Sequence, residues 1–93
     1  MKRIVLYKNI KEECVLIILP AGYSGEYHSH PGLNCIFRIL DGEMTEDLQS
    51  CEFSNDVRTV MKTGALATIN DQIGSHQIST KTGSVSLHLY SKL

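Results

Sequence analysis

The chain has 93 residues, of which 42% are hydrophobic and 20% charged, and its formal net charge is −1 at pH 7. This length favours a single domain over residues 1–93, and the near-neutral charge gives no signature of nucleic acid or of an acidic membrane surface as a partner. The longest apolar run, residues 15–19, is far too short to span a membrane.

Short runs rich in Ile, Val, Leu, Tyr and Thr alternate with turn signals along the whole chain. They predict strands over residues 3–7, 13–19, 33–41, 43–49, 57–61, 65–70, 75–79 and 84–90. Asp41-Gly42, which lies between two of these runs, predicts a hairpin turn. No stretch combines helical periodicity with helix start and stop signals. The pattern therefore predicts an all-β domain, either a sandwich or a small barrel.

The N-terminus and the cysteines indicate a compartment. Basic residues begin the chain, but the apolar run at 4–7 is too short for a signal peptide. The three cysteines, Cys14, Cys35 and Cys51, are an odd number at wide spacing and predict no disulfide framework. We expect a reducing, cytoplasmic location, and we interpret Cys14 and Cys51 as structural or as present by chance.

Two of the predicted strands carry apolar side chains on a face that the rest of the chain does not obviously cover. Val85, Leu87 and Leu89 alternate with polar residues at 84–90, and residues 14–19 are apolar throughout. Strands of this kind need cover on both faces, and the sequence offers no helix to provide it. We therefore expect a second subunit to cover this face in a homodimer.

Three of the four histidines stand in alternating patterns. Successive strand side chains point to opposite faces, so His28 and His30 share a face if residues 28–30 are a strand, as do Ser86, His88 and Tyr90. The two sets are then predicted to face inward together. Imidazoles suit Fe, Zn, Cu and Ni, although an H-x-H pair alone is a weak signal.

The third metal ligand is expected from a later strand. His76, which follows the Asn/Gly turn of INDQIGSH, is the natural candidate, the alternative being an exposed loop histidine. A site of three histidines leaves coordination positions open, as catalysis at a metal requires. The acidic residues Glu43, Glu46 and Asp47 are predicted to form a solvated edge.

A first resemblance concerns the fold. Gly22 to Gly42 reads G-x5-H-x-H-x4-C-x6-G, which resembles the first motif of the cupin β-barrels, with Cys35 where many members carry glutamate. The resemblance implies a small cupin barrel, also called a double-stranded β-helix or jelly roll. Because Cys35 is no carboxylate, a three-histidine site is expected rather than two histidines and a carboxylate.

A second resemblance is more specific. INDQIGSH, followed by VSLHLYS at 85–91 and preceded by KRIV near the start, resembles the cysteine dioxygenase family over residues 3–91. It implies Fe(II) bound by His28, His30 and His76. It also implies a Ser86–His88–Tyr90 relay, a thioether between Cys35 and Tyr90, and Arg3 as the partner of a substrate carboxylate.

The function that this resemblance implies is Fe(II)-dependent oxidation of L-cysteine, or a related small thiol, to the sulfinic acid with O2. Two alternatives stay open: 3-mercaptopropionate or another thiol acid as substrate, and a cupin that binds a metal or small ligand without turnover. Single residues also have simpler interpretations. Cys35 is equally explained as a small buried hydrophobe, Tyr90 as a core aromatic and Arg3 as a solvated charge.

Overall fold

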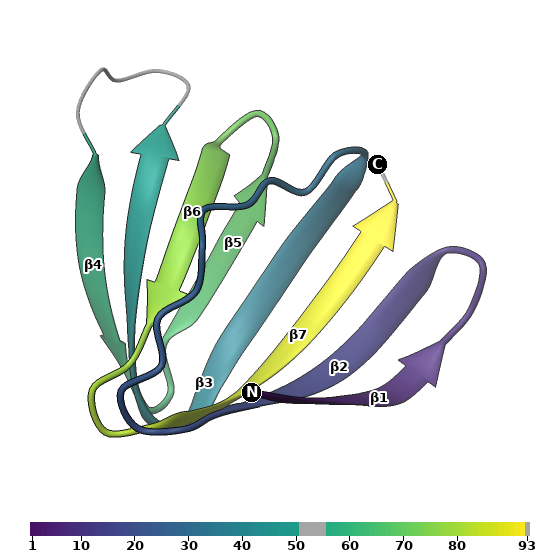
Figure 1. Cartoon of the computed structure of the whole chain (residues 1–93). Coiled ribbons are helices and arrows are strands. Elements are labelled where there is room, and N and C mark those ends of the chain that lie inside the picture. The colour runs from purple at the N-terminus through teal and green to yellow at the C-terminus, as the bar shows by residue number, and fades with distance from the viewer. Residues whose placement is uncertain (51–55, 93) are drawn as a thin grey trace.

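The computed structural model describes residues 1–50 and 56–92, which form strands connected by turns and loops (Figure 1). The strands are β1 (Lys2–Lys8), β2 (Glu12–Leu19), β3 (Leu33–Ser50), β4 (Val57–Lys62), β5 (Leu66–Asn70), β6 (Gly74–Ser79) and β7 (Ser84–Lys92). These described residues contain no helix that is long and apolar enough to cross a membrane. The all-β prediction is confirmed, and Cys51 lies outside the described residues.

The strands form two antiparallel sheets that share β3. The first half of β3 lies between β7 and β5 in a five-stranded sheet with the order β1-β2-β7-β3-β5. The second half lies between β4 and β6 in a three-stranded sheet. Figure 1 shows the two sheets opening from a common edge, with β3 bending from one into the other.

The predicted hairpin at Asp41-Gly42 is wrong, because residues 33–50 form one continuous strand. Gly42 has φ +83°, and the pairing of β3 with β7 shifts register between Ile39 and Asp41. Gly42, in its left-handed backbone conformation, thus follows a bulge within a continuous strand instead of forming a turn, and a bulge bends and twists a strand. A Cβ at Gly42 would lie 2.2 Å from the carbonyl oxygen of Gly83, so the two chains meet closely here.

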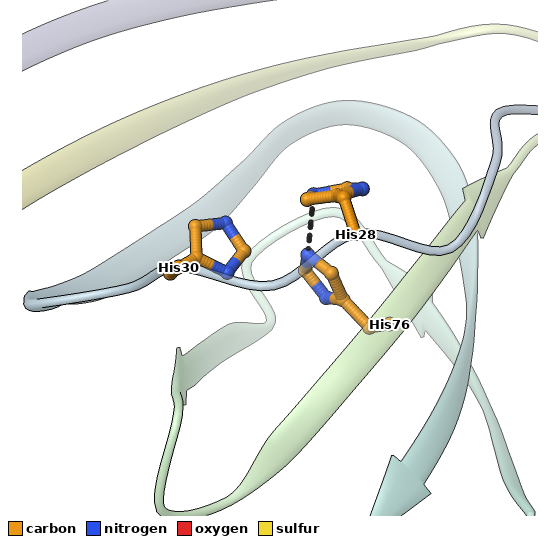
Figure 2. A group of neighbouring side chains, drawn as sticks. All are labelled: His28, His30 and His76. Atoms are coloured by element: carbon orange, nitrogen blue, oxygen red, sulfur yellow. Dashed lines mark hydrogen bonds between the residues drawn. The ribbon is translucent and has the colours of Figure 1, made fainter.

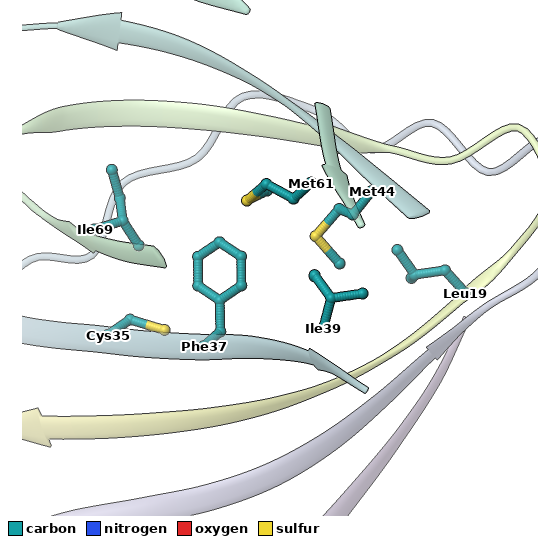
Figure 3. Close-up of a cluster of buried hydrophobic side chains, with 7 residues drawn as sticks. All are labelled: Leu19, Cys35, Phe37, Ile39, Met44, Met61 and Ile69. Carbon is teal, nitrogen blue, oxygen red and sulfur yellow. The ribbon is translucent and has the colours of Figure 1, made fainter. Parts of the chain in front are cut away.

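The hydrophobic core lies between the two sheets (Figure 3). On β3 the inward positions alternate, so that Cys35, Phe37 and Ile39 are all at most 1% exposed. Burial of a side chain such as Phe or Ile contributes about 1.5–3 kcal/mol to folding. The whole cluster consists of Leu19, Cys35, Phe37, Ile39, Met44, Met61 and Ile69.

The outer face of the five-stranded sheet is apolar as well. Ile36 is 41% exposed, Leu66 62% and Leu89 38%. Together with Cys14 and Leu87 they line a surface hollow of about 340 Å³. The apolar face expected from the sequence is therefore present, and its cover by a second subunit stays a prediction.

Candidate metal centre

The first two histidines lie on the connection between β2 and β3. The shared face of His28 and His30 was expected on the condition that residues 28–30 form a strand, and in the structure this segment has an isolated bridge, His28 to His76. Backbone hydrogen bonds run both ways across it, from His28 N to His76 O at 2.9 Å and from His76 N to His28 O at 3.0 Å. The connection is thus held against β6 by a short local pairing, which places His28 beside His76.

The three imidazoles converge on one point (Figure 2). His28, His30 and His76 each offer a ring nitrogen, and these atoms all lie within 4.8 Å of one another. The Nε2 atoms of His28 and His76 are 3.0 Å apart. His30 and His76 are buried, whereas His28 is exposed, so the cluster is reached from the side of His28.

The partners of the other ring nitrogens determine where the protons lie. His28 Nδ1 is 3.2 Å from the carbonyl oxygen of Glu26, and His76 Nδ1 is 2.9 Å from Glu46 Oε2. Carbonyl and carboxylate oxygens only accept, so each Nδ1 is the donor in its contact, and Nε2 is the ring atom that each histidine turns toward the other. The two Nε2 atoms form a hydrogen bond of 3.0 Å, and a metal ion bound by both nitrogens would replace the hydrogen that they share.

The donor set fits a metal ion on two further observations. Two nitrogens that each bind one ion at about 2.1 Å subtend about 90° when they lie 3.0 Å apart, as neighbouring ligands of an octahedral ion do. His30 Nδ1 is buried and has no hydrogen-bond partner among the described residues. Burial, and then the neighbouring histidines, lower the pKa of His30 to about 4, so the ring is neutral and able to ligate at pH 7.

Glu46 does not lie where its sequence pattern predicts. It was predicted on a solvated edge, yet it is only 9% exposed and contacts His76. The signal for it was the period of two that it shares with Met44 and Leu48, both of which face the core. Asp47, one position further, points outward and binds Arg58 through both oxygens, at 2.7 and 3.1 Å.

Ser86, His88 and Tyr90 share the inner face of β7, as their spacing predicts. Ser86 Oγ lies 2.8 Å from His88 Nε2, and the other ring nitrogen of His88 lies 3.9 Å from Cys35 Sγ. The His88 ring stacks on Phe37 at 4.9 Å and on Tyr90 at 6.0 Å between centroids. Within residues 1–50 and 56–92 the contact between His88 and Tyr90 is this stacking, and no hydrogen bond joins them.

Burial sets the protonation states of Cys35, His88 and Tyr90. It lowers the pKa of His88 to about 4 and raises the pKa values of Cys35 and Tyr90 to about 12. At neutral pH the imidazole is therefore uncharged, the thiol stays protonated and the phenol keeps its hydrogen. Cys35 and Tyr90 are direct partners across β3 and β7, which places the two side chains on one face and next to each other.

Two cavities meet at the histidines. An inner cavity of about 70 Å³ lies between the three imidazoles and a wall that includes Cys35, His88 and Tyr90. An outer cavity of about 390 Å³ shares His28, His30 and Tyr90 with it and is also lined by Arg3 and Glu13. The structure thus brings Arg3 to the mouth of the site, where its guanidinium is hydrogen-bonded to the Glu13 carboxylate.

Comparison with known families and sequences gives a consistent result. The family model described as cysteine dioxygenase type I matches residues 2–92. Cysteine dioxygenase type 1 from Homo sapiens is 32% identical over 92 residues, and that from Bos taurus is 30% identical. Each alignment covers 89% of this chain and 46% of the relative, so the chain spans about half the length of these relatives.

Solved structures confirm the fold. A cupin superfamily protein from Desulfitobacterium hafniense superposes with a TM-score of 0.83 at 15% identity, covering 99% of this chain and 77% of the other. An RmlC-like cupin from Shewanella frigidimarina has a TM-score of 0.81 at 20% identity, covering 98% and 75%. The predicted cupin barrel is therefore confirmed.

Proposed function

Because this chain belongs to the cysteine dioxygenase family, we propose that it oxidises a small thiol, L-cysteine or a close relative, to the sulfinic acid. The reaction is R–SH + O2 → R–SO2H, so both oxygen atoms enter the product and no further reductant is needed. The observation that supports the proposal is the convergence of three imidazoles, whose ring nitrogens lie within 4.8 Å of one another, on a cavity that they share with Tyr90.

His28, His30 and His76 are the residues that would hold Fe(II) in this proposal. The chemistry that the ion supplies when bound is Lewis acidity toward the thiol and electron transfer with dioxygen, at positions that three protein ligands leave open. Imidazole ligands also suit zinc, copper and nickel. The metal is therefore part of the proposal and is measured in its test.

The residues of the outer cavity would bind and orient the substrate. A thiol that enters there passes His28 and His30 and reaches Tyr90. Arg3 is the candidate partner for a substrate carboxylate, since guanidinium and carboxylate form charge-assisted hydrogen bonds. Tyr90, whose pKa is raised to about 12, keeps its phenolic hydrogen at neutral pH and would donate it to the substrate or to the developing oxygen groups.

Ser86 and His88 would act through Tyr90 as positioning residues. The Ser86 contact and the Phe37 ring fix the plane of the His88 imidazole, and Tyr90 stacks on that plane with an interplanar angle of 16°. The phenol is thereby held in one orientation over the inner cavity. An ordered donor is worth more to a reaction than a mobile one, because its orientation is fixed before the reaction begins.

A thioether between Cys35 and Tyr90 belongs to the same proposal. The cross-strand pairing of the two residues supports it. The bond would join Cys35 Sγ to a ring carbon of Tyr90 with loss of one hydrogen from each, and O2 would take up both hydrogens and leave as H2O2. Intact-protein mass spectrometry after incubation with iron, thiol and air should then show a species lighter by two hydrogens, absent from Cys35→Ser.

Oxygen uptake tests the function directly. Protein loaded with Fe(II) should consume O2 on addition of L-cysteine, with one sulfinate formed for each O2, and 3-mercaptopropionate is assayed in parallel. His76→Ala should lose most of the iron and the uptake, while Tyr90→Phe keeps the iron and reacts more slowly. Absence of uptake with L-cysteine, 3-mercaptopropionate and cysteamine alike, from protein shown to hold iron, would contradict the proposal.

A further inference from the structure

Arg3 already has a carboxylate partner within the chain. Its guanidinium donates to Glu13 Oε1, and Lys8 Nζ lies 3.4 Å from Glu13 Oε2. The hydrogen bond from Arg3 is also the main cause of the lowered pKa of Glu13, so this carboxyl is ionised at neutral pH. The side chains of Arg3 and Glu13 are 42% and 18% exposed, which leaves the pair accessible from the outer cavity.

The register of the sheet turns Glu13 toward the site. Glu13 pairs with Tyr90 across β2 and β7, and partners in an antiparallel ladder share a face. Glu13 therefore lies on the same face as Tyr90 and lines the outer cavity with Arg3, His28 and His30. A substrate carboxylate that approaches Arg3 from this cavity meets the Glu13 carboxylate at the same guanidinium.

We propose that Glu13 is a specificity-determining residue, a built-in carboxylate that competes with the carboxylate of a substrate for Arg3. This inference rests on the proposed function and names its substrate class: the site is biased toward small thiols that carry no carboxylate, such as simple aminothiols. A thiol acid must displace Glu13 from Arg3 or bind beside a like charge. A thiol without a carboxylate has neither cost.

The other charged residues of the outer cavity affect substrate binding independently of the competition for Arg3. Lys8, Lys11 and Lys92 also line the outer cavity, together with Glu12. These charges attract or repel all anions alike and act over a distance that salt screens. Glu12 therefore provides a matched control, because Glu12→Gln removes one negative charge from the same cavity without removing the partner of Arg3.

The experiment compares Fe(II)-loaded wild type, Glu13→Gln and Glu12→Gln with cysteamine, L-cysteine and 3-mercaptopropionate. Glu13→Gln should raise the ratio of kcat/KM for 3-mercaptopropionate to kcat/KM for cysteamine about fivefold, mainly by lowering KM for 3-mercaptopropionate. A fivefold change is about the largest effect expected of a partly exposed ion pair. Glu12→Gln should change the ratio less than about twofold, as expected for a screened charge. Equal changes in the two variants would overturn the proposal.

A double-mutant cycle then assigns the effect to Arg3. In an Arg3→Met background, Glu13→Gln should leave the substrate ratio unchanged, because the group for which the two carboxylates compete is absent. The same fivefold change in that background would overturn the proposal. Glu13→Asp keeps the negative charge but has a shorter side chain, so its carboxylate lies farther from Arg3. This variant should raise the substrate ratio by an intermediate amount, and it replaces Glu13→Gln in the test if that variant folds poorly.

Failure of the proposed function is distinguishable from failure of this inference. If the wild type oxidises none of the three thiols, the proposed function is wrong. The role of Glu13 is then decided by calorimetric titration of 3-mercaptopropionate and cysteamine into the same proteins without oxygen. Glu13→Gln should shift the ratio of the two dissociation constants about fivefold toward 3-mercaptopropionate, and an unchanged ratio would overturn the inference.

Discussion

His76 is oriented by a carboxylate on one side while it faces the cluster with the other. Glu46 accepts the Nδ1 hydrogen, which fixes the tautomer and leaves Nε2 as the ligating atom beside His28. A carboxylate behind an imidazole also makes the ring a stronger base and so a stronger ligand. At the scale of single residues, the proposed metal site thus depends on Glu46 as well as on its three histidines.

Replacing Glu46 should therefore weaken metal binding without removing a ligand. We expect Glu46→Gln to raise the dissociation constant for Fe(II) or Zn(II) about tenfold or more, as measured by competition with a chelator of known affinity. The matched control is Glu43→Gln on the same strand, which should leave the constant within about twofold because it is not a partner of His76. Similar losses in the two variants would refute the role given to Glu46.

His88 should make the stability of the metal-free protein depend on pH. Its pKa is about 4 in the folded chain and about 6.5 in an unfolded one, so between these values the unfolded state binds the extra proton. The free energy of unfolding should therefore decrease as pH falls from about 6.5 to 4, by up to roughly 3 kcal/mol, and then level off. His88→Gln lacks this contribution, so urea unfolding at pH 4.5 and 7 should give a smaller difference for the variant.

The sequence predicts some residues of the site and misses others for a physical reason. His28, His30, Ser86, His88 and Tyr90 were found because alternation along an extended chain is a local property. Glu46 and Glu13 were not, since an acidic residue on a strand is ordinarily solvated. The period of two indicates the inward face for Glu46, but the register between strands is what sets Glu46 near His76 and Glu13 opposite Tyr90.

At the scale of elements, β3 is the feature that the sequence did not predict. Each half of the strand was expected separately, and the Asp41-Gly42 pair between them has the composition of a hairpin turn. A hairpin and a bulge both use the positive φ that glycine allows. Which of the two forms depends on the strands available for pairing, here β5 and β7 for one half and β4 and β6 for the other.

Gly42 should accordingly tolerate no side chain. Gly42→Ala combines a strained backbone, at about 1–2 kcal/mol, with a clash against the Gly83 carbonyl, which adds about 1–3 kcal/mol. Gly64 is the control, because its φ of +92° is equally positive but nothing lies within 4 Å of an added Cβ. Denaturant unfolding should show Gly42→Ala to be the less stable variant, and equal losses would argue against close contact at the bend.

At the scale of the whole molecule, each of the two sheets packs its inner face against the core. The outer face of the five-stranded sheet is apolar. The outer face of the five-stranded sheet presents Ile36, Leu66, Leu87 and Leu89, with Arg38 among them. Contiguous apolar surface of this kind is uncommon on monomers. A second copy of the chain carries the same face and can pair with it about a two-fold axis.

The homodimer expected from the sequence is tested in solution. Static light scattering should give twice the mass of the chain at high protein concentration, and Leu89→Lys should return the mass of a single chain because it places a charge on the apolar face. Gln49→Lys, an exposed position on the three-stranded sheet, should not change the mass. A single-chain mass for the unaltered protein at high concentration would contradict the homodimer.

The position of β7 also has a consequence for how the chain reaches this structure. The last strand lies between β2 and β3, so the five-stranded sheet has a gap until residues 84–92 have been synthesised. Until then β2 and β3 each present an unpaired strand edge, and such edges pair with other chains. We infer that the chain folds only after synthesis has passed residue 92, slowly as expected for contacts of long sequence separation, and that versions cut before β7 aggregate during production.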